Sequence, residues 1–255
     1  MKRLVGGYEC VVCALSDVGL RRAENQDAWF ADQDQGLFLV ADGMGGQNAG
    51  VVASKAAADI LPKLLLERLA ALERPLEKAV EDAIREAVAD FSAGLGERAG
   101  RDPRLQGTGT TVVLALVRGR CAYVANLGDS RAYLMKGNGL RRLTEDHSVA
   151  ALMLRLGKIT VEEARTHPGR NTLTRHAGME GKAQADVRML HLKGACRMLL
   201  CTDGLTGMLA DERIREVLSA ERDGEAACRR LVDEANEAGG ADNVTAMVVD
   251  LRHPG

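Results

Sequence analysis

The chain has 255 residues, enough to bury a sizeable core and still within the range that one domain covers. We therefore predict a single domain over residues 1–255. The 34 Lys and Arg residues nearly balance 36 Asp and Glu residues, which gives a formal net charge of −2. No positive field exists that would hold a polyanion, so nucleic acid is excluded as an expected partner. With 46% hydrophobic but only 3% aromatic residues, aliphatic side chains must fill the core.

Two features of the sequence bear on location. No run of apolar residues approaches the length needed to cross a bilayer. Residues 1–9 contain two basic residues, but Gly6 and Gly7 interrupt the apolar stretch and no cleavage pattern of a secretory signal follows. We predict a mature N-terminus and a cytoplasmic protein.

The six cysteines include Cys10 and Cys13 in a CxxC arrangement. A zinc site would need a second close pair of Cys or His ligands, whereas Cys196 and Cys201 lie in apolar surroundings. Residues three apart in a strand point to opposite faces, so Cys10 and Cys13 would not converge on one metal. We predict that the cysteines are buried, reduced thiols, which suits a reducing cytoplasm.

Short β-branched or aliphatic runs, each bounded by Gly, Asp or Asn, predict seven strands. They cover residues 10–16, 36–41, 111–117, 120–125, 130–135, 197–202 and 244–251. Apolar residues at helical spacing predict helices over 49–72, 76–91 and 220–237. Pro62 is expected to bend the first helix and Pro75 to open the second.

The grouping of these elements predicts the fold class. Tight turns within residues 111–143 indicate a meander of antiparallel strands. Helices and strands are grouped rather than strictly alternating, which favours an α+β fold with antiparallel sheet. No internal repeat or linker composition marks a domain boundary.

Three aspartates follow the ends of predicted strands, and a fourth, Asp242, directly precedes the last predicted strand. Asp42 and Asp203 are each followed by Gly, Asp242 is followed by Asn, and Asp129 lies in a Gly-Asp turn. Taken singly, an Asp-Gly pair is more typical of a tight turn than of a site. Four together can converge at one rim of a sheet sandwich, where their charges would repel unless a cation neutralised them. The pattern predicts a divalent metal site.

The residue types also indicate the chemistry of that site. Mg²⁺ and Mn²⁺ prefer octahedral oxygen coordination, so a few Asp side chains and a backbone carbonyl suffice. Two such ions can lower the pKa of a shared water and hold the attacking and leaving oxygens of a phosphate ester. Arg21 and Arg22 offer guanidinium groups that match a phosphoryl group, although alone they would be a solvated surface pair.

A set of motifs runs in order from about Ser16 to Leu251. They are SDVGLRRAENQD, VADGMGG, GTTV, ANLGDSRAYL, LTEDHS, ITVEEARTHPGRNTLTR, CTDGL and GGADNVTAMVV. On this ordered set the sequence resembles the bacterial members of the metal-dependent protein phosphatases, also called type 2C or PPM phosphatases. The resemblance implies a four-layer α-β-β-α sandwich, two antiparallel sheets flanked by helices. It also implies hydrolysis of phosphoserine and phosphothreonine on proteins by a metal-activated water at a binuclear Mn²⁺ or Mg²⁺ centre.

The resemblance assigns the metal ligands residue by residue. Asp42 would bridge the two core ions, and the carbonyl of Gly43 would bind one of them. Asp203 and Asp242 would complete the pair. Asp129 would join Asp203 at a third, weaker metal site.

Further residues are implied around these ligands. Arg22 would hold the substrate phosphate, and Asp27 would lie behind the metal ligands. Gln26 stands where many relatives carry Glu, and its amide can still accept a hydrogen bond from a metal-held water but brings no charge. Residues 148–181 would form a flap beside the active site that influences substrate choice.

The group that protonates the leaving oxygen stays unassigned. Met44 stands where animal relatives place a His for this role, and bacterial members commonly have Met at this position too. His147 and His167 are candidates, but for both a structural role is favoured over catalysis. Gln47 and Val51 replace the His and Glu often found in this stretch, a change expected to alter local packing rather than chemistry.

Two rival functions are weighed against this one. A catalytically dead relative that binds phosphoproteins should have lost metal carboxylates, and all four are present. A metal-dependent phosphohydrolase of small molecules or nucleotides would share the metals but differ around the flap, and no GxxxxGK[ST] pattern is present. Resemblance to stand-alone bacterial members implies a monomer whose partners are a eukaryotic-like Ser/Thr kinase and its substrates.

Overall fold

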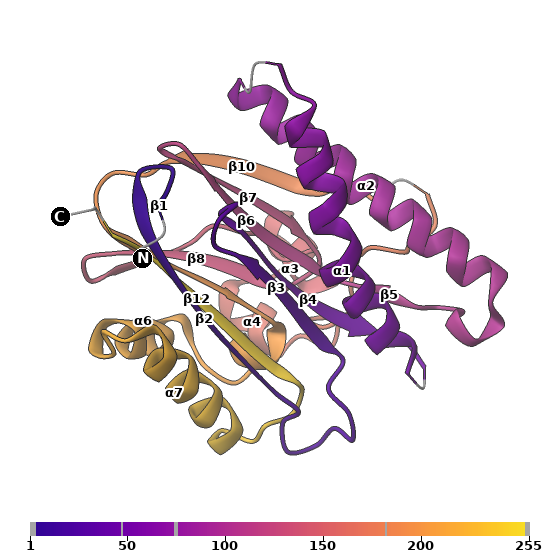
Figure 1. Ribbon diagram of the computed structural model, residues 1–255. Coiled ribbons are helices and arrows are strands. Elements are labelled where there is room, and N and C mark those ends of the chain that lie inside the picture. The colour runs from indigo at the N-terminus through magenta and orange to yellow at the C-terminus, as the bar shows by residue number, and fades with distance from the viewer. Residues whose placement is uncertain (1–3, 47, 74–75, 182, 253–255) are drawn as a thin grey trace.

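The computed structural model describes residues 4–46, 48–73, 76–181 and 183–252. Two antiparallel sheets form its centre (Figure 1). Sheet 1 has the strand order β1 (Leu4–Val5), β2 (Tyr8–Asp17), β12 (Val244–Arg252), β11 (Cys196–Cys201), β8 (Arg131–Lys136) and β9 (Gly139–Arg142). Sheet 2 has the order β10 (Asp186–His191), β7 (Cys121–Leu127), β6 (Val112–Arg118), β4 (Leu37–Met44) and β3 (Asp27–Asp32), and β5 (Gly109–Thr110) pairs with β4.

Helices cover the outer face of each sheet (Figure 1). Sheet 2 carries α1 (Ala49–Ala70) and α2 (Glu77–Arg101), which is followed by a 3₁₀ turn at Pro103–Leu105. Sheet 1 carries α6 (Asp211–Ala220) and α7 (Gly224–Glu237). Three short helices lie in the connections: α3 (Val149–Arg155), α4 (Val161–Thr166) and α5 (Asp203–Thr206).

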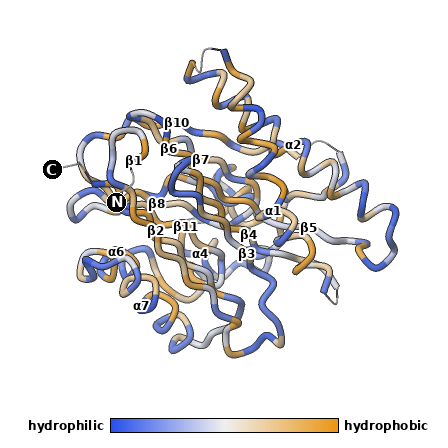
Figure 2. Tube along the Cα trace, viewed as in Figure 1, coloured by the Kyte–Doolittle hydropathy of each residue, from blue (hydrophilic) through white to orange (hydrophobic). Residues whose placement is uncertain are grey.

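Three separate hydrophobic cores hold these layers together. On β4, Leu37 and Leu39 pack against α1 and α2, whereas Phe38 and Val40 pack between the two sheets. Successive side chains of a strand point to opposite faces, so one run of apolar residues contributes to two cores. The third core lies between sheet 1 and helices α6 and α7. Figure 2 shows hydrophobic residues concentrated along the strands of both sheets. The predicted four-layer α-β-β-α sandwich is confirmed.

All seven predicted strands and all three predicted helices are present, with shifted ends. The helix predicted over 76–91 continues to Arg101, and α1 continues through Pro62, which is buried within it. Elements that were not predicted include β3, β10 and α6. The expectations for residues 1–3, Gln47 and Pro75 lie outside the described residues.

The predicted meander over 111–143 is wrong in one respect. Strands β6 and β7 form a hairpin in sheet 2, and β8 and β9 form another in sheet 1. Strands β7 and β8 belong to different sheets, so the turn at Gly128 and Asp129 carries the chain from one sheet to the other. Gly128 has φ of 117° and packs against Thr111, which leaves no room for a side chain.

The cysteines are free, as predicted, but only half of them are buried. Cys10 lies in the core between the sheets, and Cys13 packs on the opposite face of β2 against the helix side, so the two do not converge. Cys201 and Cys228 are also buried, whereas Cys13, Cys121 and Cys196 are partly exposed. The prediction of uniformly buried thiols is wrong: Cys121 and Cys196 are the first residues of their strands, and Cys13, in the middle of β2, is only partly covered.

Candidate metal centre

Five aspartates from separate parts of the chain meet where the two sheets end together. Asp27 begins β3 and pairs with Asp42 on β4; Asp203 begins α5 directly after β11, and Asp242 precedes β12. Asp129 lies in the turn between β7 and β8. Burial raises the pKa of the Asp42 carboxyl well above its usual value, and the charges of the other four raise it further. The four aspartates singled out in the sequence, Asp42, Asp129, Asp203 and Asp242, are therefore neighbours, and Asp27 lies beside them.

Backbone hydrogen bonds fix Asp42 at the end of β4. Its carbonyl oxygen accepts from the backbone N–H of Thr111 at 2.8 Å and from the hydroxyl of Thr110 at 2.9 Å. Its own N–H donates to the hydroxyl oxygen of Thr111 at 2.9 Å. The following residue, Gly43, has no room for a side chain, since a Cβ there would lie 2.0 Å from the carbonyl oxygen of Gly50. Helix α1 lies so close to the end of β4 that both facing residues, Gly43 and Gly50, must be glycine.

Two hydroxyl groups from sheet 1 hold Asp27, which belongs to sheet 2. Thr202 and Thr245 donate to the same oxygen, Oδ2, at 2.9 and 2.6 Å. The carboxyl group is buried, which raises the pKa of Asp27 to about 7, although the two hydroxyl donors oppose that rise. These threonines escaped the sequence analysis, where they were part of the CTDGL and DNVT motifs but had no assigned role. Their position one residue before Asp203 and three residues after Asp242 was the available signal.

Asp129 depends on a histidine that the sequence analysis considered for catalysis. The Nδ1 atom of His147 accepts from the N–H of Gly128 at 3.1 Å, and Nε2 donates to Asp186 at 3.2 Å. The ring is buried, with 3% of the residue exposed. Both nitrogens are engaged, so His147 supports the turn that carries Asp129, in agreement with the favoured structural role.

Arg22 lies at the open side of the cluster. Its guanidinium donates to Asp242 Oδ2 at 2.6 Å, and this hydrogen bond is the main reason that the pKa of Arg22 is raised. The loop that carries it is held by the side-chain amide of Asn243, which donates to the carbonyls of Val18 and Glu24, both at 2.9 Å. Arg22 is 54% exposed at its side chain, so further N–H groups of its fork face solvent.

Gln26, Met44 and His167, the remaining candidate for proton transfer, make few contacts with the aspartates. The Gln26 side-chain amide donates to Glu24 at 2.8 Å, and its Oε1 lies against Gly50 at the start of α1. Met44 ends β4 opposite Gly109 and has no ionisable group. The Nδ1 atom of His167 accepts from the N–H of Gly169 within the segment predicted as a flap, which contains α3 and α4. None of these contacts assigns a general acid.

The aspartates fit a divalent cation. Oδ1 of Asp27 and Oδ1 of Asp203 are buried and accept no hydrogen bond from any described residue. Burial raises the pKa values of Asp129 and Asp203, and the nearest carboxylates raise them further, since Asp203 acts on Asp129 and Asp242 on Asp203. Buried, clustered carboxyl groups with unpaired oxygens need a positive charge, and an all-oxygen set suits Mg²⁺ or Mn²⁺. The residues present therefore fit such ions.

Two antiparallel sheets between helix layers, with a cluster of carboxylates that fits divalent cations where the sheets end together, are the arrangement expected of a metal-dependent enzyme. Comparison with known proteins names the family. Residues 21–244 match the protein phosphatase 2C family. The chain is 36% identical over 238 residues to the serine/threonine phosphatase stp of Listeria welshimeri, covering 92% of this chain and 93% of that protein.

Solved structures agree with this match. The serine/threonine phosphatase PstP/Ppp of Mycobacterium tuberculosis superposes with a TM-score of 0.83 at 33% identity, covering 96% of this chain and 99% of that one. The catalytic domain of PstP in complex with two manganese ions superposes with a TM-score of 0.79 at 30% identity, covering 95% and 98%. The chain belongs to the protein phosphatase 2C family.

Proposed function

We propose that this chain is a protein serine/threonine phosphatase that hydrolyses phosphoserine and phosphothreonine on proteins. The predicted enzyme class, a phosphoprotein hydrolase dependent on Mn²⁺ or Mg²⁺, is confirmed by its family. The observation that carries the proposal is the meeting of five aspartates from both sheets beside one exposed arginine. The single-domain organisation over residues 1–255 is part of the same proposal.

The metal ligands proposed are the side chains of Asp42, Asp203 and Asp242 and the carbonyl of Gly43, with Asp129 beside Asp203 for a third ion. Mn²⁺ or Mg²⁺ bound there would supply the positive charge that lowers the pKa of a water and neutralises the phosphate. Their fit rests on the unpaired buried oxygens and the mutual repulsion of the carboxylates.

The remaining residues bind, orient and support. Arg22 is proposed to hold the phosphoryl group, because its planar fork presents several N–H donors and Asp242 uses one of them. Asp27 keeps the two sheets in register behind the ligands through Thr202 and Thr245. Gln26 braces the start of α1 against Gly43. Residues 148–181 are proposed as the flap that contacts the protein substrate.

Partners and location extend the proposal. We propose that phosphorylated proteins, including a eukaryotic-like Ser/Thr kinase and its substrates, are the partners of a monomeric, cytoplasmic enzyme. Relatives named serine/threonine phosphatase stp and protein phosphatase PhpP support the substrate class. Among the described residues, no helix combines the length and apolar character that a membrane span requires.

The test is release of phosphate from a phosphothreonine peptide with Mn²⁺, with Mg²⁺ and with EDTA. We expect metal-dependent release in the wild type and its loss in Asp42→Ala and Asp203→Ala. The exposed Asp59 on α1 offers a matched control, and Asp59→Ala should keep full activity. Retained activity in Asp42→Ala would contradict the proposed site, and hydrolysis of nucleotides in place of phosphopeptides would favour the small-molecule alternative.

A further inference from the structure

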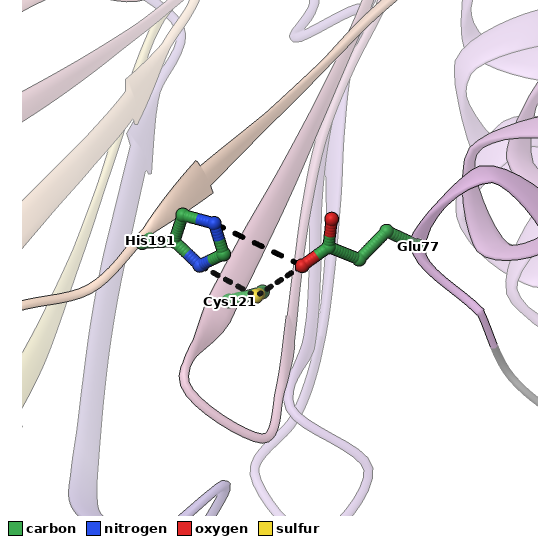
Figure 3. A group of neighbouring side chains, drawn as sticks. All are labelled: Glu77, Cys121 and His191. Atoms are coloured by element: carbon green, nitrogen blue, oxygen red, sulfur yellow. Dashed lines mark hydrogen bonds and ion pairs between the residues drawn. The ribbon is translucent and has the colours of Figure 1, made fainter.

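A cluster of three side chains with metal-binding atoms lies outside the aspartate centre. Cys121 begins β7 and stands opposite His191, the last residue of β10, in the strand register. Glu77 begins α2 and reaches over the same edge. Figure 3 shows the thiol, the imidazole and the carboxylate turned toward one another. Residues from one helix and two strands thus converge on a point that no part of the proposed phosphatase reaction uses.

The distances within this cluster suit a tetrahedral ion. Zinc lies about 2.3 Å from sulfur and about 2.0–2.2 Å from nitrogen or oxygen, so two of its ligand atoms are separated by roughly 3.4–3.6 Å. Cys121 Sγ lies 3.4 Å from His191 Nδ1 and 3.8 Å from Glu77 Oε1. The three ligand atoms all lie within 4.8 Å of one another. The sulfur and Nδ1 are already at ligand spacing, whereas Glu77 Oε1 lies 3.8 Å from the other ring nitrogen, Nε2, so the carboxylate must move toward the sulfur and Nδ1 to complete the set.

Access and flexibility favour binding at this point. Cys121 is partly exposed, and the side chains of His191 and Glu77 are 61% and 53% exposed. An ion can therefore enter from solvent, and a water can complete the coordination. Glu77 can close the remaining distance to the other two ligand atoms by rotating about its three side-chain bonds. Because Glu77 is the first residue of α2, this change of rotamer costs little free energy.

The cluster is separate from the aspartate centre in place and in chemistry. Strand β7 runs from Cys121 to Leu127, directly before the turn that carries Asp129. Six residue steps of a strand span about 20 Å, so the two sites lie at opposite ends of sheet 2. The aspartate centre offers only oxygen, which suits Mn²⁺ and Mg²⁺, whereas sulfur and imidazole select a softer ion.

We propose that Glu77, Cys121 and His191 form a binding site for Zn²⁺ or a similar transition-metal ion, with three protein ligands and one water. The Cys121 thiol gives up its proton to solvent when the ion binds, and His191 binds through Nδ1 as the neutral imidazole. The bound ion joins the start of α2 to the ends of β7 and β10. Its effect is to stabilise the packing of α2 on sheet 2, not to take part in phosphate hydrolysis.

The experiment uses Co²⁺ as a coloured substitute for Zn²⁺, with excess Mg²⁺ present to occupy the aspartate centre. We expect one equivalent of Co²⁺ to give a thiolate-to-metal charge-transfer band, and Zn²⁺ to displace it. The band should be absent in Cys121→Ser. Glu77→Gln and His191→Gln should bind at least about tenfold more weakly, as loss of even outer partners costs that much.

Controls separate this site from the other thiols and from the aspartates. Cys196 is also partly exposed, on the neighbouring sheet, so Cys196→Ser should keep the band. Asp42→Asn should keep it too, because the aspartate centre contributes no sulfur. A folded wild type without the band, or a band that persists in Cys121→Ser, overturns the proposal. Should Cys121→Ser fail to fold, unchanged affinity in both Glu77→Gln and His191→Gln overturns it instead.

Discussion

Two threonine hydroxyls converge on one oxygen of Asp27, and this is the smallest unit on which the centre depends. Thr202 follows β11 and Thr245 lies in β12, so the contact crosses from sheet 1 to sheet 2. Loss of such a donor leaves a buried carboxylate oxygen without a hydrogen bond, which destabilises the protein by about 1–3 kcal/mol. The polar contact therefore sets both the position of Asp27 and the alignment of the sheets.

Replacing either hydroxyl tests this unit. We expect Thr202→Val and Thr245→Val each to lower the free energy of unfolding by about 1–3 kcal/mol, because a donor to buried Asp27 is lost. Urea unfolding with EDTA present measures the change without a contribution from bound metal. Thr206→Val, on the neighbouring helix α5, is the matched control and should change stability little. Wild-type stability in both Thr202→Val and Thr245→Val would show that the two hydroxyls are not needed.

His147 offers a prediction of pH dependence at the same scale. Burial lowers the pKa of its imidazole, and Arg175 lowers it further, while Asp186 and Asp146 oppose that shift. The folded protein therefore binds fewer protons at this site than the unfolded chain, whose histidine titrates near 6.5. Stability from neutral His147 is present above that pH and is lost as the pH falls below it, because protonated Nδ1 cannot accept from Gly128.

The comparison variant is His147→Asn, whose side-chain oxygen can replace Nδ1 as acceptor and does not titrate. We expect the wild type to lose more unfolding free energy than His147→Asn between pH 7.5 and pH 5.5, measured by urea unfolding. Equal losses in the two proteins would mean that protonation of His147 does not disturb the turn at Gly128 and Asp129.

At the scale of elements, the approach of α1 to β4 positions the proposed carbonyl ligand. A Cβ at Gly50 would lie 2.5 Å from Gln26 Oε1 and 2.7 Å from the carbonyl oxygen of Gly43. Helix α1 can press on the end of β4 only because this helical position is glycine. The helix thus sets where the Gly43 carbonyl points.

Gly50→Ala should therefore disturb the centre more than an ordinary surface change. We expect the added methyl to displace the Gly43 carbonyl, to weaken Mn²⁺ binding and phosphatase activity by about tenfold or more, and to cost about 1–3 kcal/mol of stability. Gly46→Ala is the control, because a Cβ there meets nothing within 4 Å. Calorimetric titration with Mn²⁺ and urea unfolding separate the two effects, and full Mn²⁺ affinity in Gly50→Ala would contradict the positioning role.

Across the whole molecule, the aspartate centre joins the two sheets. Asp27 and Asp42 belong to strands of sheet 2, whereas Asp203 and Asp242 adjoin strands of sheet 1. Their mutual repulsion opposes the closing of the sandwich at this end, and a bound cation would reverse that repulsion. Folding and metal binding are therefore linked.

We expect Mn²⁺ to stabilise the protein by about 2.7 kcal/mol at a free concentration one hundred times the dissociation constant. Thermal unfolding with Mn²⁺ and with EDTA measures this difference. In Asp42→Asn the response to Mn²⁺ should shrink, while the protein in EDTA should become more stable because one repelling charge is gone. An unchanged response to Mn²⁺ in that variant would contradict the ligand assignment.

The sequence predicted much of this correctly, and the reasons are local. Asp42 and Asp203 could be singled out because each follows an apolar strand at a short turn, and Asp242 because it directly precedes one; such patterns depend only on residues near in the chain. The seven strands and three helices followed from hydrophobic periodicity, which depends on residues near in the chain. The ordered motifs indicated the family and, through that resemblance, the four-layer sandwich and the dependence on metal.

Contacts between distant segments were beyond such patterns. The clamp of Thr202 and Thr245 on Asp27 joins residues about two hundred positions apart, and only sheet packing brings them together. The sequence around Asp129 predicts a turn within a meander, whereas the turn joins the two sheets, because a tight turn has the same sequence pattern within one sheet and between two. The same holds for Glu77, Cys121 and His191, which share no motif and meet because strand register and helix packing place them at one edge. The sequence by itself determined the strongly apolar strands, three of the helices and the carboxylates next to strand ends. The tertiary structure decided which groups hold those carboxylates and which distant side chains become neighbours, because that choice depends on how the layers pack rather than on order along the chain.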